Sequence, residues 1–150
     1  MRMGTFLATL TLAVGLAQAA SSTIEVEHPW ARPGTRGGNS AVYMEVHNRS
    51  SSTDRLVAAE AEVAEAVELH RTRTEGGMHR MEKVESIEIP GRAKVELKPG
   101  GYHIMLIRLT RPLRVGDRFP LKMRFERAGE LVIRVPVRQE EESDRGGGHR

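Results

Sequence analysis

Residues 119–125 read Phe-Pro-Leu-Lys-Met-Arg-Phe, with an apolar side chain at every second position. Successive side chains of a β-strand point to opposite faces of the sheet, so this alternation predicts a strand with one buried face. The same period of two recurs at Ile24/Val26, Val42/Met44/Val46, Val67/Leu69, Ile87/Ile89, Val95/Leu97 and Ile133/Val135/Val137. We therefore expect at least seven strands.

Turn-forming residues separate these segments, among them Gly76-Gly77, Pro90-Gly91 and Pro99-Gly100-Gly101. Only residues 57–66 have a helix-like composition, and they are too few to set the fold class. Many short strands joined by turns indicate an all-β fold, an antiparallel Greek-key barrel or sandwich. We expect one domain over residues 20–137 and a disordered polar tail over residues 138–150, because that tail has little apolar surface to bury.

The first 19 residues have the features of a secretory signal peptide: a positive charge at Arg2, an apolar stretch from Phe6 to Ala17, and the small residues Ala17 and Ala19 before the expected cleavage site. That apolar stretch is shorter than the roughly 20 residues of a membrane-spanning helix. We expect a periplasmic protein without a membrane anchor. The chain has no cysteine, so it can form no disulfide, offer no thiolate to a metal and carry no lipid on an N-terminal cysteine.

The charge pattern argues against nucleic-acid binding. The formal net charge is +3, and basic residues are interspersed with acidic ones, whereas a phosphate-binding face needs a concentrated basic patch. The sequence shows no Ser-His-Asp set, carboxylate-pair motif or phosphate-binding loop. We expect a binding protein rather than an enzyme.

Four residues carry donors that suit a soft metal ion: His70, Met81, His103 and Met105. Imidazole and thioether groups together favour Cu(I), because polarizable sulfur prefers a soft monovalent ion. His103 and Met105 lie two apart in an expected strand, so their side chains share one face. We therefore predict a copper site built from these four residues.

The other two donors depend on a hairpin. If Gly76-Gly77 are the central residues of its turn, Met81 lies opposite Thr72 and diagonally from His70 on the same face, within reach of one ion. That register also places His79 on this face as a spare ligand and turns Met78 away. Such a site has neutral donors, so copper occupancy should fall as the histidines protonate near their ordinary pKa of about 6.5.

The spacing of His70, Met81, His103 and Met105 resembles the signature of the periplasmic copper-A chaperones (PCuAC): His, ten residues, Met, twenty-one residues, then His-x-Met. The resemblance spans about residues 24 to 137. The agreement extends to Trp30-Ala31-Arg32, Asp54-Arg55-Leu56-Val57, Glu68-Leu69-His70, Gly116-Asp117 and the run from Leu97 to Leu106, Leu-Lys-Pro-Gly-Gly-Tyr-His-Ile-Met-Leu.

The resemblance implies a cupredoxin-like β-barrel that holds one Cu(I) at an exposed rim. The implied client is the dinuclear copper centre of cytochrome c oxidase subunit II, sometimes together with a thioredoxin-like copper assembly factor, and we expect a monomer. The chain departs from the family at Arg71, where many members have Met. Its tail offers only His149, whereas some members have a tail rich in His and Met that holds a second copper, so we do not expect a second, Cu(II), site.

Several other residues have simpler interpretations. We expect Met44 and Met123 to fill the core, and His28, His47 and His149 to be surface or hydrogen-bonded histidines. Trp30 is expected to close one end of the barrel, Arg32 to pair with an acidic residue, and Asp54-Arg55 to make a local turn contact. Arg71, Arg73 and Arg80 crowd the hairpin, where they could face an acidic client.

Two alternative functions remain beside delivery. The protein could store or buffer copper, or confer resistance to it, without a dedicated client. It could instead be a metal-free β-sandwich that binds a partner through a sheet edge. A blue-copper electron-transfer centre is excluded, since it needs a cysteine ligand.

Overall fold

The computed structural model describes residues 23–140. These residues form ten β-strands: β1 (Ile24–Ala31), β2 (Ser40–Asn48), β3 (Asp54–Glu60), β4 (Ala64–Glu75), β5 (Met78–Lys83), β6 (Ile87–Ile89), β7 (Lys94–Leu97), β8 (Tyr102–Leu109), β9 (Arg118–Phe125) and β10 (Gly129–Pro136). Over this range no helix is long and apolar enough to cross a membrane. The expected signal peptide lies outside the described residues.

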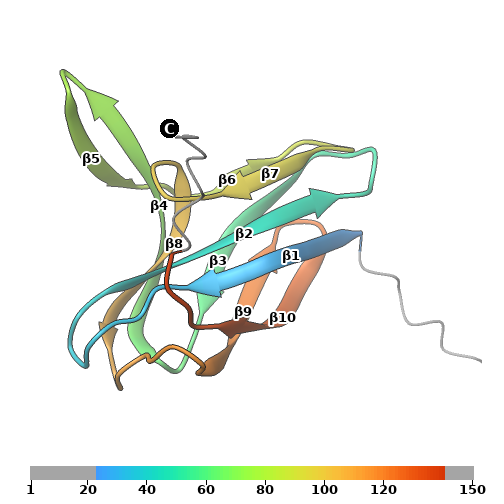
Figure 1. Ribbon diagram of the computed structural model, residues 1–150. Coiled ribbons are helices and arrows are strands. Elements are labelled where there is room, and N and C mark those ends of the chain that lie inside the picture. The colour runs from blue at the N-terminus through green and yellow to red at the C-terminus, as the bar shows by residue number, and fades with distance from the viewer. Residues whose placement is uncertain (1–22, 141–150) are drawn as a thin grey trace, which may run out of the picture.

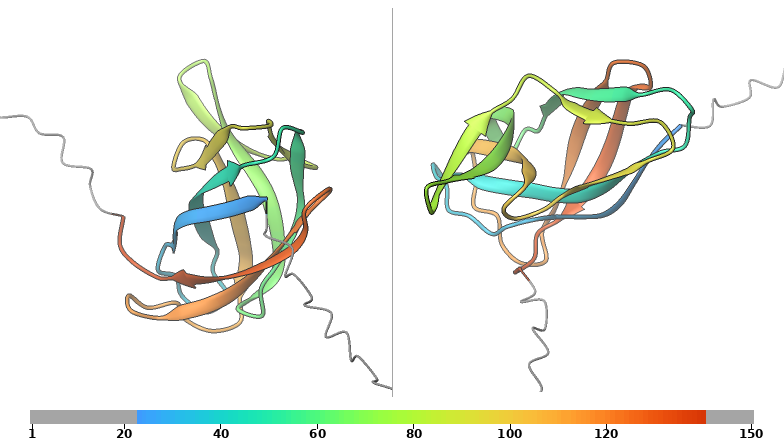
Figure 2. Two further views of the ribbon diagram at one scale, coloured as in Figure 1. Left: turned by 90° about the vertical axis from the view of Figure 1, so that its right-hand side faces the viewer. Right: turned by 90° about the horizontal axis from the view of Figure 1, so that it is seen from above.

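The strands form two antiparallel sheets (Figures 1 and 2). The six-stranded sheet has the order β1-β2-β8-β4-β5, with β7 also paired to β2, and the four-stranded sheet has the order β10-β9-β3-β6. A parallel bridge between Ala31 and Val137 joins the two sheets at one side. The prediction of an all-β single domain is confirmed, in the form of a two-sheet sandwich.

The core lies between the two sheets and follows the alternation seen in the sequence. In β9, Phe119, Leu121, Met123 and Phe125 are buried and the residues between them are exposed. Met44, Ile104 and Leu106 of the six-stranded sheet belong to the same apolar cluster. Burying each such side chain stabilises the fold by about 1.5–3 kcal/mol. The placement of Met44 and Met123 in the core is therefore confirmed.

The segment with helix-like composition does not form a helix. Residues 57–66 complete β3, turn at residues 61–63 and begin β4. Ala59, Val63 and Ala64 are buried in the core, and β3 pairs with both β9 and β6. Helix propensity is a weak preference that tertiary pairing overrides, which is the reason for the difference.

Asp54 does more than the expected local turn contact. Its carboxylate accepts hydrogen bonds from the backbone N–H groups of Arg55 at 2.8 Å, Arg127 at 2.8 Å and Ala128 at 2.9 Å. The last two belong to the turn between β9 and β10, 73 and 74 residues away along the chain. Asp54 therefore fixes that turn from β3.

The β4–β5 hairpin has the expected register. Gly76 and Gly77 both have positive φ angles, 58° and 79°, as a two-residue type I′ turn requires. Glu75 pairs with Met78 and Thr72 with Met81. Figure 1 shows this hairpin extending away from the rest of the sandwich, so its tip is free of the core.

After β10, the first residues of the expected C-terminal tail remain in contact with the domain. The Arg138 backbone N–H donates to the Ala31 carbonyl at 3.0 Å, and Glu140 pairs with Arg32 at 2.9 Å. Arg32 thus pairs with an acidic residue, as expected. The rest of the expected tail lies outside the described residues.

Candidate metal centre

His103 and Met105 lie on β8, which is paired with β2 on one side and β4 on the other. Because side chains alternate along the strand, Ile104 and Leu106 enter the core while His103 and Met105 point to the opposite face. His103 is nevertheless only 2% exposed. The outer face of the sheet therefore carries a small buried cluster of its own.

A row of rings across four neighbouring strands forms this cluster. His70 on β4 is paired with His103 on β8, with ring centroids 5.7 Å apart. The Tyr43 ring on β2 is 6.2 Å from His103, and the Trp30 ring on β1 is 4.9 Å from Tyr43. Trp30, expected at an end of the barrel, is thus two rings away from His103, on the face that carries both histidines.

Each histidine uses one ring nitrogen in a hydrogen bond. His103 Nδ1 lies 3.2 Å from the Gly101 carbonyl oxygen, and His70 Nε2 lies 2.7 Å from Glu68 Oε2. The remaining nitrogens, His103 Nε2 and His70 Nδ1, are buried and have no hydrogen-bond partner. A buried polar atom without a partner costs free energy, so these two atoms suit a ligand such as a metal ion.

The surroundings keep His103 in the form that can bind a metal. Burial is the main cause that lowers its pKa below the ordinary 6.5, and nearby His70 and Arg32 lower that pKa further, against an opposing effect of the Gly101 hydrogen bond. The neutral ring therefore dominates at pH 7. Neutral imidazole is the metal-binding form.

The two methionines line one open hollow of about 150 Å³ on this side of the molecule. Its walls are Arg32, Pro33, Asn39, Ser40, Ala41, Tyr43, Met81 and Met105. Tyr43 contacts His103 and also lines the hollow, so it links the methionine pair to the histidine pair. The structure therefore places His70 beside His103, and Met81 and Met105 line one hollow, whose wall includes the Tyr43 ring that neighbours His103.

His79 lies farther out on the hairpin. Its Nδ1 is 3.2 Å from Thr74 Oγ1, and the ring is exposed. Met78, which the register turns to the other face, is 63% exposed. Neither residue lines the hollow that Met81 and Met105 share.

Sequence reasoning missed two residues of this centre, Tyr43 and Glu68. Glu68 lies two residues before His70 on the same strand face, directly opposite Met105. Tyr43 occupies the outward position between Val42 and Met44. A search for polar residues two positions from each candidate ligand would have found Glu68, whereas Tyr43 depends on how β2 pairs with its neighbours.

Two of the three hairpin arginines expected to face a client already pair with a carboxylate of the hairpin. Arg71 and Arg73 both pair with Glu82, at 3.0 and 3.3 Å. These contacts lower the pKa of Glu82, with the Arg71 hydrogen bond as the largest cause. Among the described residues, Arg80 makes no ion pair.

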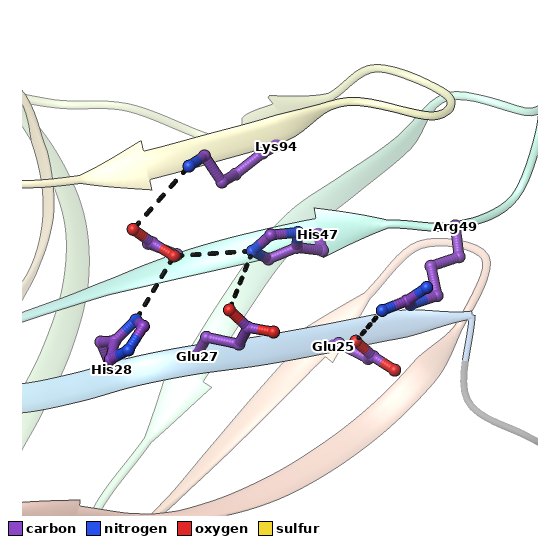
Figure 3. A network of polar contacts seen from close by, with 7 residues as sticks. Glu25, Glu27, His28, His47, Arg49 and Lys94 are labelled. Carbon is purple, nitrogen blue, oxygen red and sulfur yellow. Dashed lines mark hydrogen bonds and ion pairs between the residues drawn. The ribbon is translucent and has the colours of Figure 1, made fainter.

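A second group of possible ligands lies elsewhere on β1 and β2 (Figure 3). Donor atoms of Glu27, Glu45 and His47 lie within 4.8 Å of one another. Glu45 is also 3.4 Å from His28 and 3.9 Å from Lys94. These carboxylates already face cationic or imidazole partners, so the group is a surface ion-pair network. His28 and His47 lie in it as the surface histidines that were expected.

A family model and a relative of known sequence both match most of this chain, and both are named for lipoproteins. The family model described as LpqE-like, a family named for a lipoprotein, matches residues 24–137. Lxx21020 of Leifsonia xyli subsp. xyli, which is named as a lipoprotein, is 32% identical over 116 residues, covering 77% of this chain and 69% of that protein.

Two solved structures agree with that match. The copper-bound PCuAC domain from PmoF2 has a TM-score of 0.65 and 28% identity, over 77% of this chain and 92% of that domain. The Cu(I) form of DR1885 from Deinococcus radiodurans has a TM-score of 0.63 and 28% identity, over 82% of this chain and 85% of that one. The resemblance to PCuAC domains is confirmed.

Proposed function

The chain belongs to the LpqE-like family, and on that premise we propose that it is a copper chaperone that works outside the cytoplasm. It binds one Cu(I) through His70, Met81, His103 and Met105. It delivers the ion to the dinuclear copper centre of cytochrome c oxidase subunit II. Its similarity to the copper-bound PmoF2 domain and to Cu(I)-DR1885 supports the metal.

One observation carries this proposal more than any other. His70 Nδ1 and His103 Nε2 are buried and lack a hydrogen-bond partner, and their rings lie 5.7 Å apart. Met81 and Met105 line a hollow whose wall includes Tyr43, the neighbour of His103. Two imidazole nitrogens and two thioethers form a donor set that suits a soft monovalent ion.

The donor set also explains how the ion can leave. Thioethers and neutral imidazoles bind copper without losing a proton, so no anionic ligand among these four holds the charge of the ion. Met81 is 59% exposed, and a ligand from a client can therefore approach the metal from that side. Sequential exchange of donors would pass copper on without releasing it to water.

A location outside the cytoplasm is consistent with a metal site that uses thioether donors. A lipoprotein name for both the matched family and Lxx21020 supports a location outside the cytoplasm, as does the signal peptide expected at residues 1–19. Thioethers cannot form disulfides, so they remain usable donors where free thiols would oxidise.

A transfer experiment tests delivery. Cu(I)-loaded protein is mixed with the apo copper-centre domain of an oxidase subunit II, the two are separated, and copper is measured in each. We expect the metal to move to the oxidase domain, and a parallel reaction with a thioredoxin-like assembly factor tests whether that factor is required. Retention by the loaded protein in both reactions would favour buffering or storage. Failure to bind Cu(I) at all would favour a metal-free interaction module.

A further inference from the structure

We infer that the two histidines bind copper through different ring nitrogens, Nδ1 of His70 and Nε2 of His103, and that Glu68 is a positioning residue that sets this choice for His70. The inference rests on the proposed function, because it assumes that copper is the ligand. It adds which atoms bind the metal and what orients them.

The case of His103 follows from its carbonyl partner. A backbone carbonyl oxygen can only accept a hydrogen bond, so the contact between Gly101 O and His103 Nδ1 at 3.2 Å places the proton on Nδ1. The lone pair of the neutral ring is then on Nε2. That atom is buried and has no partner among the described residues.

The case of His70 has the opposite outcome. An ionised carboxylate is also only an acceptor, so the 2.7 Å contact with Glu68 Oε2 places the proton on Nε2 of His70. The lone pair is then on Nδ1, which is likewise buried and unpartnered. In both rings, the nitrogen left without a partner is the one that can coordinate a metal.

Glu68 is itself held in place. Lys83, which pairs with His70 across the β4–β5 hairpin, has its Nζ 3.6 Å from Glu68 Oε1. The two carboxylate oxygens therefore face different partners, Lys83 and His70. A metal-binding histidine whose other N–H donates to a carboxylate is fixed in orientation and is a stronger donor.

The opposite mechanism is chemically possible and gives a different result. If copper binds His70 through Nε2, Glu68 occupies the metal's place in the free protein and must leave during loading. Removing Glu68 would then tighten copper binding. Under our inference, removing it weakens binding, because the ring loses the partner that fixes its tautomer.

The first test reads the tautomers directly. Two-bond 1H–15N NMR of the metal-free protein, labelled with 15N at histidine, should show His70 protonated at Nε2 and His103 protonated at Nδ1. After addition of Cu(I), the His70 Nε2 proton should remain. A His70 ring protonated at Nδ1, or loss of the Nε2 proton on loading, would overturn the inference.

The second test uses variants and Cu(I) alone. Glu68→Ala should weaken Cu(I) binding about 10–100-fold, the range measured when such hydrogen-bond partners of metal ligands are removed. Glu68→Gln, whose amide oxygen can still accept from Nε2, should recover much of the affinity and the His70 tautomer. Glu65→Ala is the matched control, since it removes a carboxylate from the same strand that pairs with Arg108 instead.

Unchanged or tighter binding by Glu68→Ala would overturn the role of Glu68. The two levels of the proposal remain separable. If the wild-type protein binds Cu(I) but His70 uses Nε2, only this inference fails. If the wild-type protein binds no Cu(I), the proposed function fails and takes this inference with it.

Discussion

Three strands supply the donors of the candidate copper centre, and two of them, β8 and β5, differ sharply. β8 lies inside the six-stranded sheet between β2 and β4, and its His103 is 2% exposed. β5 is an edge strand of that sheet, and its Met81 is 59% exposed. The two strands therefore have different roles: β8 holds one donor in a fixed position, and β5 presents another donor that a partner can reach.

A protein that both binds and transfers a metal ion needs fixed donors and accessible donors. A centre enclosed on all sides would hold its ion too firmly for transfer, and one assembled entirely from exposed side chains would lose entropy each time it ordered around the ion. Here His103 is oriented by Gly101 before any metal arrives. Met81 lies on the hairpin and is largely exposed.

The largest effect is expected on the fixed side. His103→Ala should weaken Cu(I) binding by at least about 100-fold, because losing a ligand should cost no less than losing a partner of a ligand. Competition with a coloured Cu(I) chelator measures the change. His28→Ala is the control, since that histidine lies in the surface network of Glu45, and an equal loss of affinity in both variants would contradict the assignment.

On the open side, Met81→Leu should weaken Cu(I) binding at least about tenfold while changing the free energy of unfolding by no more than about 0.5 kcal/mol, as is usual for an exposed position. Met78→Leu provides a matched control on the same hairpin, with similar exposure and the opposite direction of the side chain. The same chelator competition and a urea unfolding curve compare the two. Similar affinities for both variants would remove Met81 from the centre.

A substitution in the β4–β5 turn should weaken copper binding less than loss of a ligand does. It should affect β5 and leave β8 unchanged. Gly77 has a φ of 79°, and a residue with a Cβ pays about 1–2 kcal/mol there. Gly77→Ala should therefore weaken copper binding by up to about tenfold and speed hydrogen exchange at residues 78–83, with β8 unchanged. Hydrogen exchange followed by mass spectrometry checks this. Faster exchange in β8 would show that the two sides are not independent.

The smallest expected effect is on how the free energy of unfolding changes with pH. Because burial lowers the pKa of His103, the unfolded chain binds a proton at this position more readily than the folded one. The contribution of the neutral ring is present above pH 6.5 and is lost as the pH falls from there through the lowered pKa. Urea unfolding between pH 7.5 and 5.5 should show a steeper loss of stability for the wild type than for His103→Gln. Equal slopes would contradict a buried neutral ring.

Much of the framework could be predicted from sequence because it is encoded locally. Alternation marks a strand whenever one face is buried, as in Phe119 to Phe125, and two adjacent glycines specify the hairpin turn and hence the pairing of Thr72 with Met81. The shared face of His103 and Met105 follows from their separation by two residues.

The parts that sequence missed depend on contacts between distant segments. Residues 57–66, which end β3 and begin β4, are rich in alanine, and β3 is a strand because it pairs with β9. Asp54 stabilises a turn more than 70 residues away. Tyr43 joins the centre through the placement of β2 beside β8, and no local pattern states such a pairing. Glu68 is different, because it lies two residues before His70 on the same strand face, so its contact with His70 could have been expected from the sequence.

X-ray absorption at the copper edge of the Cu(I)-loaded protein tests the central claim most directly. We expect one copper per chain with two sulfur and two nitrogen donors, and the loss of one sulfur donor in Met81→Leu. A spectrum with only nitrogen and oxygen donors, or one whose sulfur contribution is unchanged when Met81 and Met105 are both replaced by leucine, would contradict the shared centre.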